Sequence, residues 1–217
     1  DWLGGFSVGS EQAFSVRFGL DEPDEAQAAG VGAALTTKWG TPLGAGISDR
    51  ITYLLWRYGD TTDAEEAAAL AHLLHSWTAA PTNPTQLDPS NGAATIAYDA
   101  PFHLTKLSAG AQALVAQMTA DSALYGDSWS FHPVAPAPRQ QTVPSTWTFR
   151  MATPGDVGVP SFPLHLELVG GTFPGGATTL DVVTPADGSP LEVEITPTAA
   201  AVDLLAEYEL REASAWM

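Results

Sequence analysis

Residues 50–77 read RITYLLWRYGDTTDAEEAAALAHLLHSW, and this stretch decides the fold of the first half of the chain. Apolar side chains recur every three or four residues from Ile51 to Tyr58, which is the spacing of an amphipathic helix. Ser48 is the expected N-cap of this helix, and Gly59 is expected to end it. The short joint at Gly59 predicts that a second helix follows at once and packs against the first.

The second helix is expected from Ala64 to Trp77, after a cap supplied by the Thr61-Thr62-Asp63 run. Glu65 and Glu66 lie in its first turn, where the helix dipole favours negative charge. The alanine-rich sequence of this segment predicts a strong helix.

Outside the helix pair, the N-terminal part mixes strand and helix patterns. Residues 11–20 alternate apolar and polar side chains and predict a strand. Residues 108–124 predict a third amphipathic helix, whereas 81–100 have the composition of a loop. Residues 1–138 are therefore expected to form an α+β domain of strands and a helix pair.

The C-terminal part has a different pattern, which begins after the proline-rich residues 133–138. These prolines predict a stiff connector between two domains. Five short β-rich runs follow, separated by Pro-Gly, Gly-Gly and Asp-Gly turns. They are 147–151, 162–169, 178–183, 191–195 and 202–210. Residues 139–217 are therefore expected to form an all-β, immunoglobulin-like sandwich.

Composition excludes several classes of function. The 217 residues include 8 Lys and Arg against 25 Asp and Glu, a formal net charge of −17. Nucleic acids and anionic membranes need clustered positive charge, so neither is an expected partner. The chain has no cysteine, which excludes disulfides and thiolate sites and favours an exported protein. No apolar run approaches the about 20 residues that a membrane-spanning helix needs.

Two stretches resemble the thioester domains of Gram-positive, notably actinobacterial, surface proteins. Ala13-Phe14-Ser15-Val16 resembles the aromatic-cysteine-aliphatic motif of these domains, and residues 50–77 resemble their helix pair. Residues 147–168 resemble the stalk domains that follow them, which are CnaB-like or invasin-like sandwiches. The resemblance implies a cell-wall-associated, extracellular adhesin.

The chain departs from the thioester family at both reactive positions. The family joins a cysteine sulfur to a glutamine side chain on the second helix. Ser15 stands where the resemblance places the cysteine, and no glutamine occurs between residues 60 and 77. Lys38 and Lys106 are the only lysines, so the expected sandwich cannot form the lysine isopeptide bond of many stalk domains. Ser15 is thus expected to be a vestigial thioester position.

Other candidate sites are weak at the level of sequence. His72 and His75 have an i, i+3 spacing that could bind a metal, but no third ligand is marked. We expect them to lie on the helix surface or to bond to a loop carbonyl. The acidic run 21–25 lacks the spacing of a calcium loop and is expected to be solvated. Among seven tryptophans, Trp39 is the candidate for contact with a ligand, while Trp56, Trp77 and Trp147 are expected in cores. No cofactor, metal or catalytic residue is expected.

The sequence thus predicts a non-enzymatic, structural or adhesive module of a surface protein or filament. Its partner would be a protein or glycan ligand, or further copies of the chain. Two alternatives stay open. One is a secreted glycoside or ester hydrolase with a site built from scattered Asp and Glu with His103 or His132. The other is a polymer subunit with complementary apolar patches on opposite faces.

Overall fold

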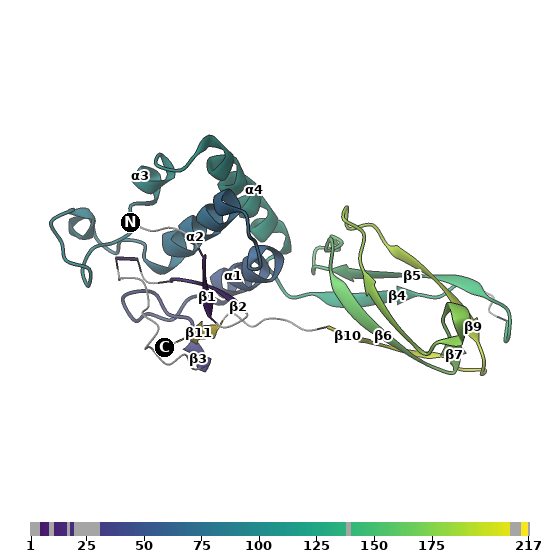
Figure 1. Ribbon diagram of the computed structural model, residues 1–217. Helices are drawn as coiled ribbons and strands as arrows, with labels where there is room; N and C mark the ends of the chain where they lie inside the picture. Colours follow the sequence, from purple (N-terminus) through teal and green to yellow (C-terminus); the bar gives the residue numbers. More distant parts are fainter. Residues whose placement is uncertain are drawn as a thin grey trace. The chain divides into compact units, whose positions relative to one another are not determined.

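The computed structural model describes residues 5–8, 11–16, 18–19, 31–137, 140–208 and 214–216. The chain divides into two compact units (Figure 1). The first unit comprises Asp1–Gly126 together with Arg211–Met217, and the second comprises Asp127–Leu210. The second unit is therefore inserted between two segments of the first, and each unit is described here by itself.

The first unit contains four α-helices, one 3₁₀ helix and short strands among its described residues. The helices are α1 (Ala45–Tyr58), α2 (Ala64–Thr78), the 3₁₀ helix η1 (Pro84–Leu87), α3 (Ala100–Leu104) and α4 (Ala109–Tyr125). The strands are β1 (Gly5–Val8), β2 (Glu11–Phe14), β3 (Val31–Ala34) and β11 (Ser214–Trp216). β1 pairs with β2, and β3 pairs with β11, both antiparallel.

The helix pair forms as expected, with one correction at its start. The Asp63 carboxylate accepts hydrogen bonds from the backbone N–H groups of Glu65 and Glu66 and so caps α2. Gly59 ends α1, as predicted. The predicted N-cap Ser48 is wrong, because α1 begins at Ala45 after Gly44, and no side chain caps it.

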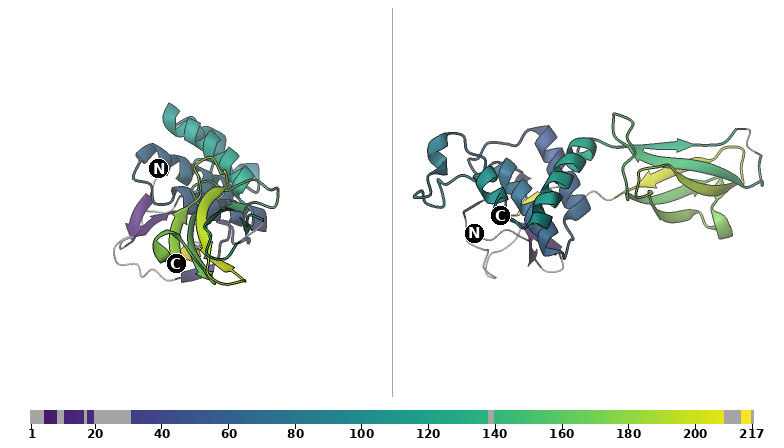
Figure 2. Two further views of the ribbon diagram at one scale, coloured as in Figure 1. Left: turned by 90° about the vertical axis from the view of Figure 1, so that its right-hand side faces the viewer. Right: turned by 90° about the horizontal axis from the view of Figure 1, so that it is seen from above.

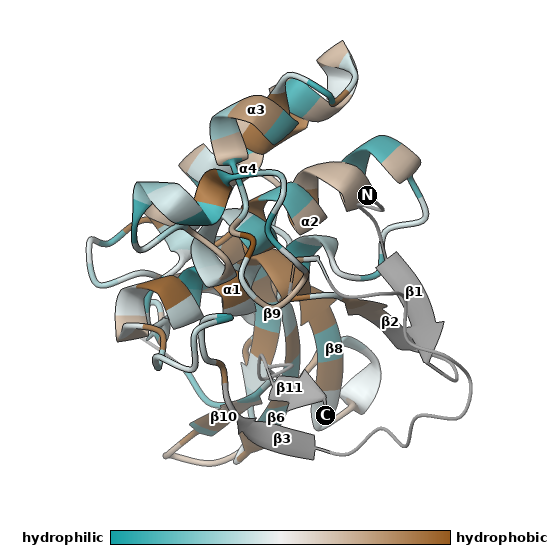
Figure 3. Ribbon diagram, turned by 90° about the vertical axis from the view of Figure 1, so that its left-hand side faces the viewer, coloured by the Kyte–Doolittle hydropathy of each residue, from teal (hydrophilic) through white to brown (hydrophobic). Residues whose placement is uncertain are grey.

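The core of the first unit is a layer of helices in which α2 packs against both α1 and α4 (Figure 2). α4 is capped by Ser108, as expected for the third helix. Apolar residues of these helices are coloured brown in Figure 3. The fully buried members are Ile51, Leu54, Ala69, Leu70, Leu74 and Met118.

The N-terminal strand is shorter than predicted, and two short helices were not predicted. β2 ends at Phe14. Among the described residues, it therefore covers only the first part of the strand that was predicted over residues 11–20. η1 and α3 lie in or at the end of a region expected to be loop. Each is capped by a polar side chain, Asn83 for η1 and Asp99 for α3, so the loop composition itself supplies the caps.

The second unit consists of two antiparallel sheets. Its strands are β4 (Ser130–Val134), β5 (Ser145–Ala152), β6 (Pro163–Val169), β7 (Gly171–Thr172), β8 (Thr179–Val183), β9 (Leu191–Pro197) and β10 (Asp203–Glu207). One sheet has the order β4-β5-β9-β7, and the other has the order β10-β6-β8. Each of the five predicted β-rich runs contains one strand, and the single helical turn described here is the 3₁₀ helix η2 (Pro174–Gly176).

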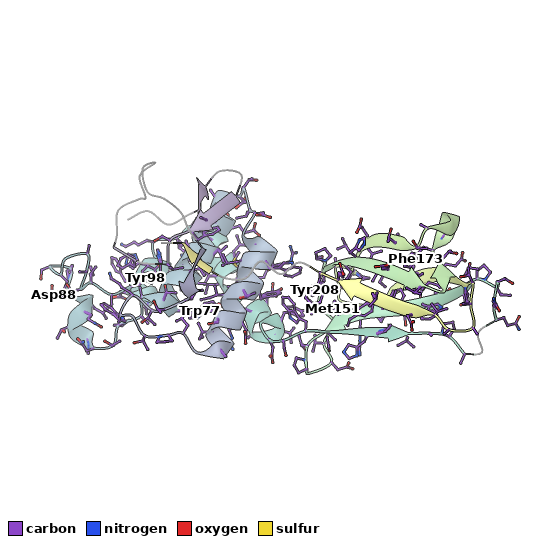
Figure 4. The ribbon with its side chains drawn as sticks, turned by 90° about the horizontal axis from the view of Figure 1, so that it is seen from below. Trp77, Asp88, Tyr98, Met151, Phe173 and Tyr208 are labelled. Atoms are coloured by element: carbon purple, nitrogen blue, oxygen red, sulfur yellow. The ribbon has the colours of Figure 1, made fainter. Side chains whose placement is uncertain are left out.

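Alternating burial shows that each sheet has one inner and one outer face. The burial of β6 alternates residue by residue, because successive side chains of a strand point to opposite sides. The inner residues include Trp147, Phe149, Met151, Leu164, Leu166, Leu168, Val193 and Ile195. Figure 4 labels Met151 and Phe173, both of which are buried in this unit. The mixed α+β class expected from the sequence is therefore confirmed.

The compact units do not divide at residue 138. Pro133 and Val134 belong to β4, which pairs with β5, so the start of the proline-rich stretch is part of a sheet and not a connector. Proline is tolerated there because β4 is an edge strand. The boundary lies between Gly126 and Asp127, where α4 ends.

Two glycines bring distant loops of the second unit into close contact. A Cβ placed on Gly158 would collide with the carbonyl oxygen of Gly188, and a Cβ on Gly188 would collide with that of Gly158. Gly188 also has a φ of 72°, which side chains disfavour. The turn predicted at Asp187-Gly188 is confirmed, with the Gly188 N–H donating to the Pro185 carbonyl over 3.0 Å.

We expect Gly158→Ala to lower the free energy of unfolding by about 1–3 kcal/mol, because backbone must shift to admit the methyl group. Gly155→Ala is the matched control, since its Cβ would meet only Thr153 Oγ1 at 3.8 Å. Urea unfolding followed by tryptophan fluorescence measures both. Equal stability of the two variants would show that the loops do not approach each other in solution.

Candidate functional site

Ser15 lies beside the C-terminal half of α2. Thr78, on the last turn of α2, donates its hydroxyl to the Val16 carbonyl over 2.7 Å, which fixes the segment that follows β2. A backbone interaction between Ser15 and the His75 ring raises the pKa of that histidine. Ser15 is half-buried and follows the end of β2 at Phe14. The fold therefore places Ser15 against the helix that the resemblance pairs with it.

Lys38 holds this segment to two other parts of the first unit. Its ammonium group donates to the Phe18 carbonyl over 2.5 Å and to the Ile96 carbonyl over 2.6 Å. Its backbone N–H donates to the Thr78 carbonyl over 2.6 Å. Partial burial lowers the pKa of Lys38 from its ordinary value. One side chain thus joins three stretches that are distant in the sequence.

Tyr98 is the centre of an aromatic cluster next to this junction. Its ring stacks on His103 with the centroids 4.5 Å apart and an interplanar angle of 8°. The rings of Phe18, His75 and His72 meet its ring edge-on, at 4.9, 5.3 and 5.5 Å. Its hydroxyl lies 2.7 Å from His72 Nδ1. We call Phe18, His72, His75, Tyr98 and His103 the histidine–tyrosine cluster; Figure 4 labels Tyr98.

The histidines of the cluster are held neutral. Burial lowers the pKa of His72 to about 4, and the charge of His103 lowers it further. Burial likewise lowers the pKa of His75 to about 4. The pKa of His103 is lowered by burial and raised by Asp99. The His72 and His75 imidazoles are therefore uncharged at neutral pH.

His75 is the least satisfied polar group of the cluster. Only 3% of the residue is exposed, and neither ring nitrogen makes a hydrogen bond of ordinary geometry among the described residues. Burial of an unbonded polar atom is costly, so such groups are rare in folded proteins. A position on the helix surface is wrong for both histidines, since both are buried. The backbone of Ser15 beside the His75 ring is nearer to the other expectation, a histidine that meets a loop segment.

Hydrolysis by Ser15 would need further catalytic groups beside it. A serine nucleophile needs a base and a third group that orients the base. Within the described chain, no carboxylate hydrogen-bonds to His72 or His75. His103 belongs to the first unit, whereas His132 lies in β4 of the second and is 2.7 Å from the Ser130 hydroxyl. The geometry is that of a packed junction.

Trp39 is partly accessible at the margin of this junction. Its indole N–H donates to the Ala80 carbonyl over 2.9 Å, and Lys38 Nζ lies 5.7 Å from its ring centroid. The ring is thus fixed with part of its surface exposed. Trp147 is buried at 4% exposure, as predicted. Trp56 and Trp77 are half-buried, so their expected place in the core is wrong.

The described residues do not form a metal-binding site. In the ranges given above, no group of three or more His, Cys, Asp or Glu side chains could hold a metal ion. The acidic run 21–25 lies outside the described residues. No described helix is both long and apolar enough to cross a membrane.

Two residues of the junction carried no signal in the sequence. Lys38 is marked only as one of two lysines, and Tyr98 lies in a stretch that reads as loop. Their importance comes from contacts across the fold, such as the 58 residues between Lys38 and Ile96. The histidine spacing on α2 was visible, but burial of that face was not.

Comparison with known proteins identifies no relative. No protein-family model, no curated protein and no solved structure matches this chain. The resemblance to thioester and stalk domains therefore stays a prediction from the residues quoted above.

The neutral histidines predict that stability falls in mild acid. Their unfolded pKa is about 6.5, above the folded value of about 4. The unfolded state therefore takes up more protons than the folded state as the pH falls from about 6.5 to 4. The contribution of the two histidines to the free energy of unfolding is complete above that range and is lost within it. We expect a loss on the order of several kcal/mol from the two histidines together, measured as the fall in the free energy of unfolding of the first unit in urea.

The variant His75→Leu should reduce this pH dependence, since one of the two groups is removed. His132→Leu, at an exposed position of β4, is the control and should leave it unchanged. An unaltered pH profile in His75→Leu would contradict the burial of His75.

Proposed function

We propose that this chain is a non-enzymatic, structural or adhesive module of an extracellular, cell-wall-associated surface protein or filament. Its first unit would be a thioester-like domain without the covalent bond, and its second an immunoglobulin-like stalk. The observation that carries the proposal is the position of Ser15. It lies against the last turns of α2, the helix that the resemblance pairs with it, and its described surroundings are hydrogen bonds and aromatic packing.

The surroundings of Ser15 favour a structural role. Its neighbour His75 is buried and neutral, and the nearby ammonium of Lys38 is engaged by two backbone carbonyls. A lysine whose hydrogen bonds hold three segments together is poorly placed to attack an external acyl group. The junction thus supplies by hydrogen bonding and aromatic packing a link between β2 and α2 that the resemblance assigns to a covalent bond.

The pairing of the second unit supports a stalk of the immunoglobulin type. Two antiparallel sheets with alternating burial are the elements of such a sandwich. All described residues of this unit are strands, turns and one 3₁₀ helix, with no cluster that could hold a metal ion. A β-sandwich unit of this kind is suited to spacing a binding module from its anchor.

The surface chemistry indicates the kind of partner. A net charge of −17 disfavours nucleic acids and anionic membranes. A half-exposed tryptophan held by its N–H can stack on a sugar or an apolar side chain, so Trp39 is the proposed contact with a glycan or protein ligand. Association with further copies would build a filament.

Intact mass spectrometry tests the covalent part of this proposal. We expect the mass of the purified chain to equal the mass computed from its sequence. An isopeptide bond, or an ester formed from an Asn or Gln side chain, would remove one ammonia, about 17 Da. An ester formed from a carboxylic acid would remove one water, about 18 Da, by the stoichiometry of those condensations. A deficit that vanishes in Ser15→Ala would show that Ser15 is reactive and would refute the structural role.

Adhesion under flow tests the binding part. Beads coated with the chain should be retained on at least one surface of an array of glycans and extracellular matrix proteins. Trp39→Ala should reduce retention roughly tenfold, as loss of an aromatic contact does. Phe102→Ala, which removes another exposed ring of the first unit, is the control. Retention by neither protein, together with ester or glycoside hydrolysis that is lost in Ser15→Ala, would favour a hydrolase.

A further inference from the structure

The second unit has a sheet edge that is open in the described part of the chain. β10 pairs with β6 on one side, and it is the last strand of the sheet β10-β6-β8 (Figure 1). It is the yellow strand that ends near Tyr208 in Figure 4. Among the described residues, no backbone hydrogen bond reaches its outer side.

The register identifies which backbone groups point outward. The Leu168 N–H donates to the Thr178 carbonyl over 2.8 Å, so Leu168 and alternate residues of β6 bond towards β8. Glu167 therefore bonds towards β10, where it is opposite Leu205. By the same alternation, the N–H and C=O groups of Leu204 and Ala206 point away from β6. These four groups are the acceptors and donors of the open edge.

Comparison with the immunoglobulin pattern explains why this edge is open. Strands A, B and E of such a sandwich pair in that order, as β4, β5 and β9 do. The opposite sheet contains strands C and F, with C′ beside C and G beside F. The order β10-β6-β8 matches F-C-C′, so β10 takes the place of F. The place of strand G is not filled by any described residue.

The side chains of β10 determine which strand the edge can accept. Asp203, Leu205 and Glu207 lie on the outer face of the sheet and are exposed, Leu205 to 53%. The edge thus presents one apolar side chain between two carboxylates. Leu204 and Ala206 are half-buried, since the inner face has no neighbour beyond β10. An added strand would cover both faces of this edge.

A second copy of β10 is a poor occupant. Antiparallel pairing of two copies about Leu205 would place Asp203 of each opposite Glu207 of the other. Like charges directly opposite destabilise a strand pair, and two chains of net charge −17 repel each other as well. A strand with basic residues two positions on either side of an apolar one would form two ion pairs around a contact with Leu205.

We propose that the open edge of β10 binds an extended segment of another protein by strand addition, and that this segment carries Lys or Arg flanking an apolar residue. Main-chain bonds to Leu204 and Ala206 supply the pairing, and Asp203 and Glu207 supply the selectivity. The inference goes beyond adhesion through Trp39, because it concerns a different unit and does not depend on where the protein is located.

The other sheet edges are less suited to this role. β4 contains Pro133, which cannot donate a backbone hydrogen bond. In β8, Asp181 is the only acidic residue, and its carboxylate accepts a hydrogen bond from His165 Nδ1 over 2.6 Å. That carboxylate is therefore already bonded to a ring nitrogen, whereas no ion pair is described for Asp203 or Glu207. His165 also lies opposite Glu207 across the ladder, and Glu207 contributes to the raised pKa of His165, so Asp203 is the less compensated of the two carboxylates.

The test uses the full chain and an amidated synthetic peptide, Thr-Lys-Val-Val-Val-Lys-Thr, with a control peptide in which both lysines are replaced by glutamate. Amide hydrogen exchange followed by NMR reports the site of binding. We expect the lysine peptide to slow exchange of the Leu204 and Ala206 amides, and the glutamate peptide to bind roughly tenfold more weakly or not at all.

Two variants separate pairing from charge. Ala206→Pro removes an outward N–H without touching the ladder to β6, and it should abolish binding; Thr179→Pro, at the matching outward position of β8, should not. The double change Asp203→Lys with Glu207→Lys should reverse the preference between the two peptides. A preserved thermal transition in each variant shows that the unit is folded.

Three outcomes would overturn the proposal. The first is no slowing of exchange at any edge by the lysine peptide up to its solubility limit. The second is protection of the β8 amides instead of those of β10. The third is a concentration-dependent dimer that protects Leu204 and Ala206 without peptide, which would assign the edge to a second copy. None of these outcomes bears on retention through Trp39.

Discussion

The first unit depends on the need to satisfy polar groups on a buried helix. Nine of the fifteen residues of α2 are buried, and three of these, His72, His75 and Thr78, carry polar side chains. Polar atoms removed from water must find partners within the protein. Thr78 is satisfied by the Val16 carbonyl and His72 by Tyr98, so these demands fix where the neighbouring segments lie. Helix packing positions α2, and its polar side chains then position the chain around it.

Lys38 extends this junction beyond the helix. Its ammonium joins the Phe18 and Ile96 carbonyls, and its backbone bonds the last turn of α2. The segments of this junction are held together by several directional hydrogen bonds and ring contacts, which is consistent with a structural role. It also accounts for the histidines, which fill the space between α2 and Tyr98 as neutral rings. Function in this unit is therefore sought at its partly exposed margin, where Trp39 lies.

In the second unit, the constraint is the pairing of strands. Alternating burial lets strands such as β6 bury one face, and the seven strands form two sheets whose edge strands are β4 and β7 in one and β10 and β8 in the other. Of these, β10 ends its sheet with two unpaired residues and two carboxylates. An edge of this kind can be protected against like partners by charge while it remains open to a basic strand. Stability and selectivity at this edge thus come from the same side chains.

The local elements were determined by the sequence itself, because helix periodicity, strand alternation and turn glycines act over a few residues. This is why α2, α4 and the strands of the second unit lie where expected. The prediction of Ser48 as the N-cap of α1 was wrong, since α1 begins at Ala45 and extends past this suitable capping residue. Only the tertiary structure decided which face of α2 is buried, and it alone brought Ser15, Lys38 and Tyr98 to one junction. It also placed the unit boundary at the end of α4, before the prolines that were expected to form a linker, and left one edge of β10 unpaired. These features depend on contacts between segments far apart in the chain, for which a single sequence holds no local pattern.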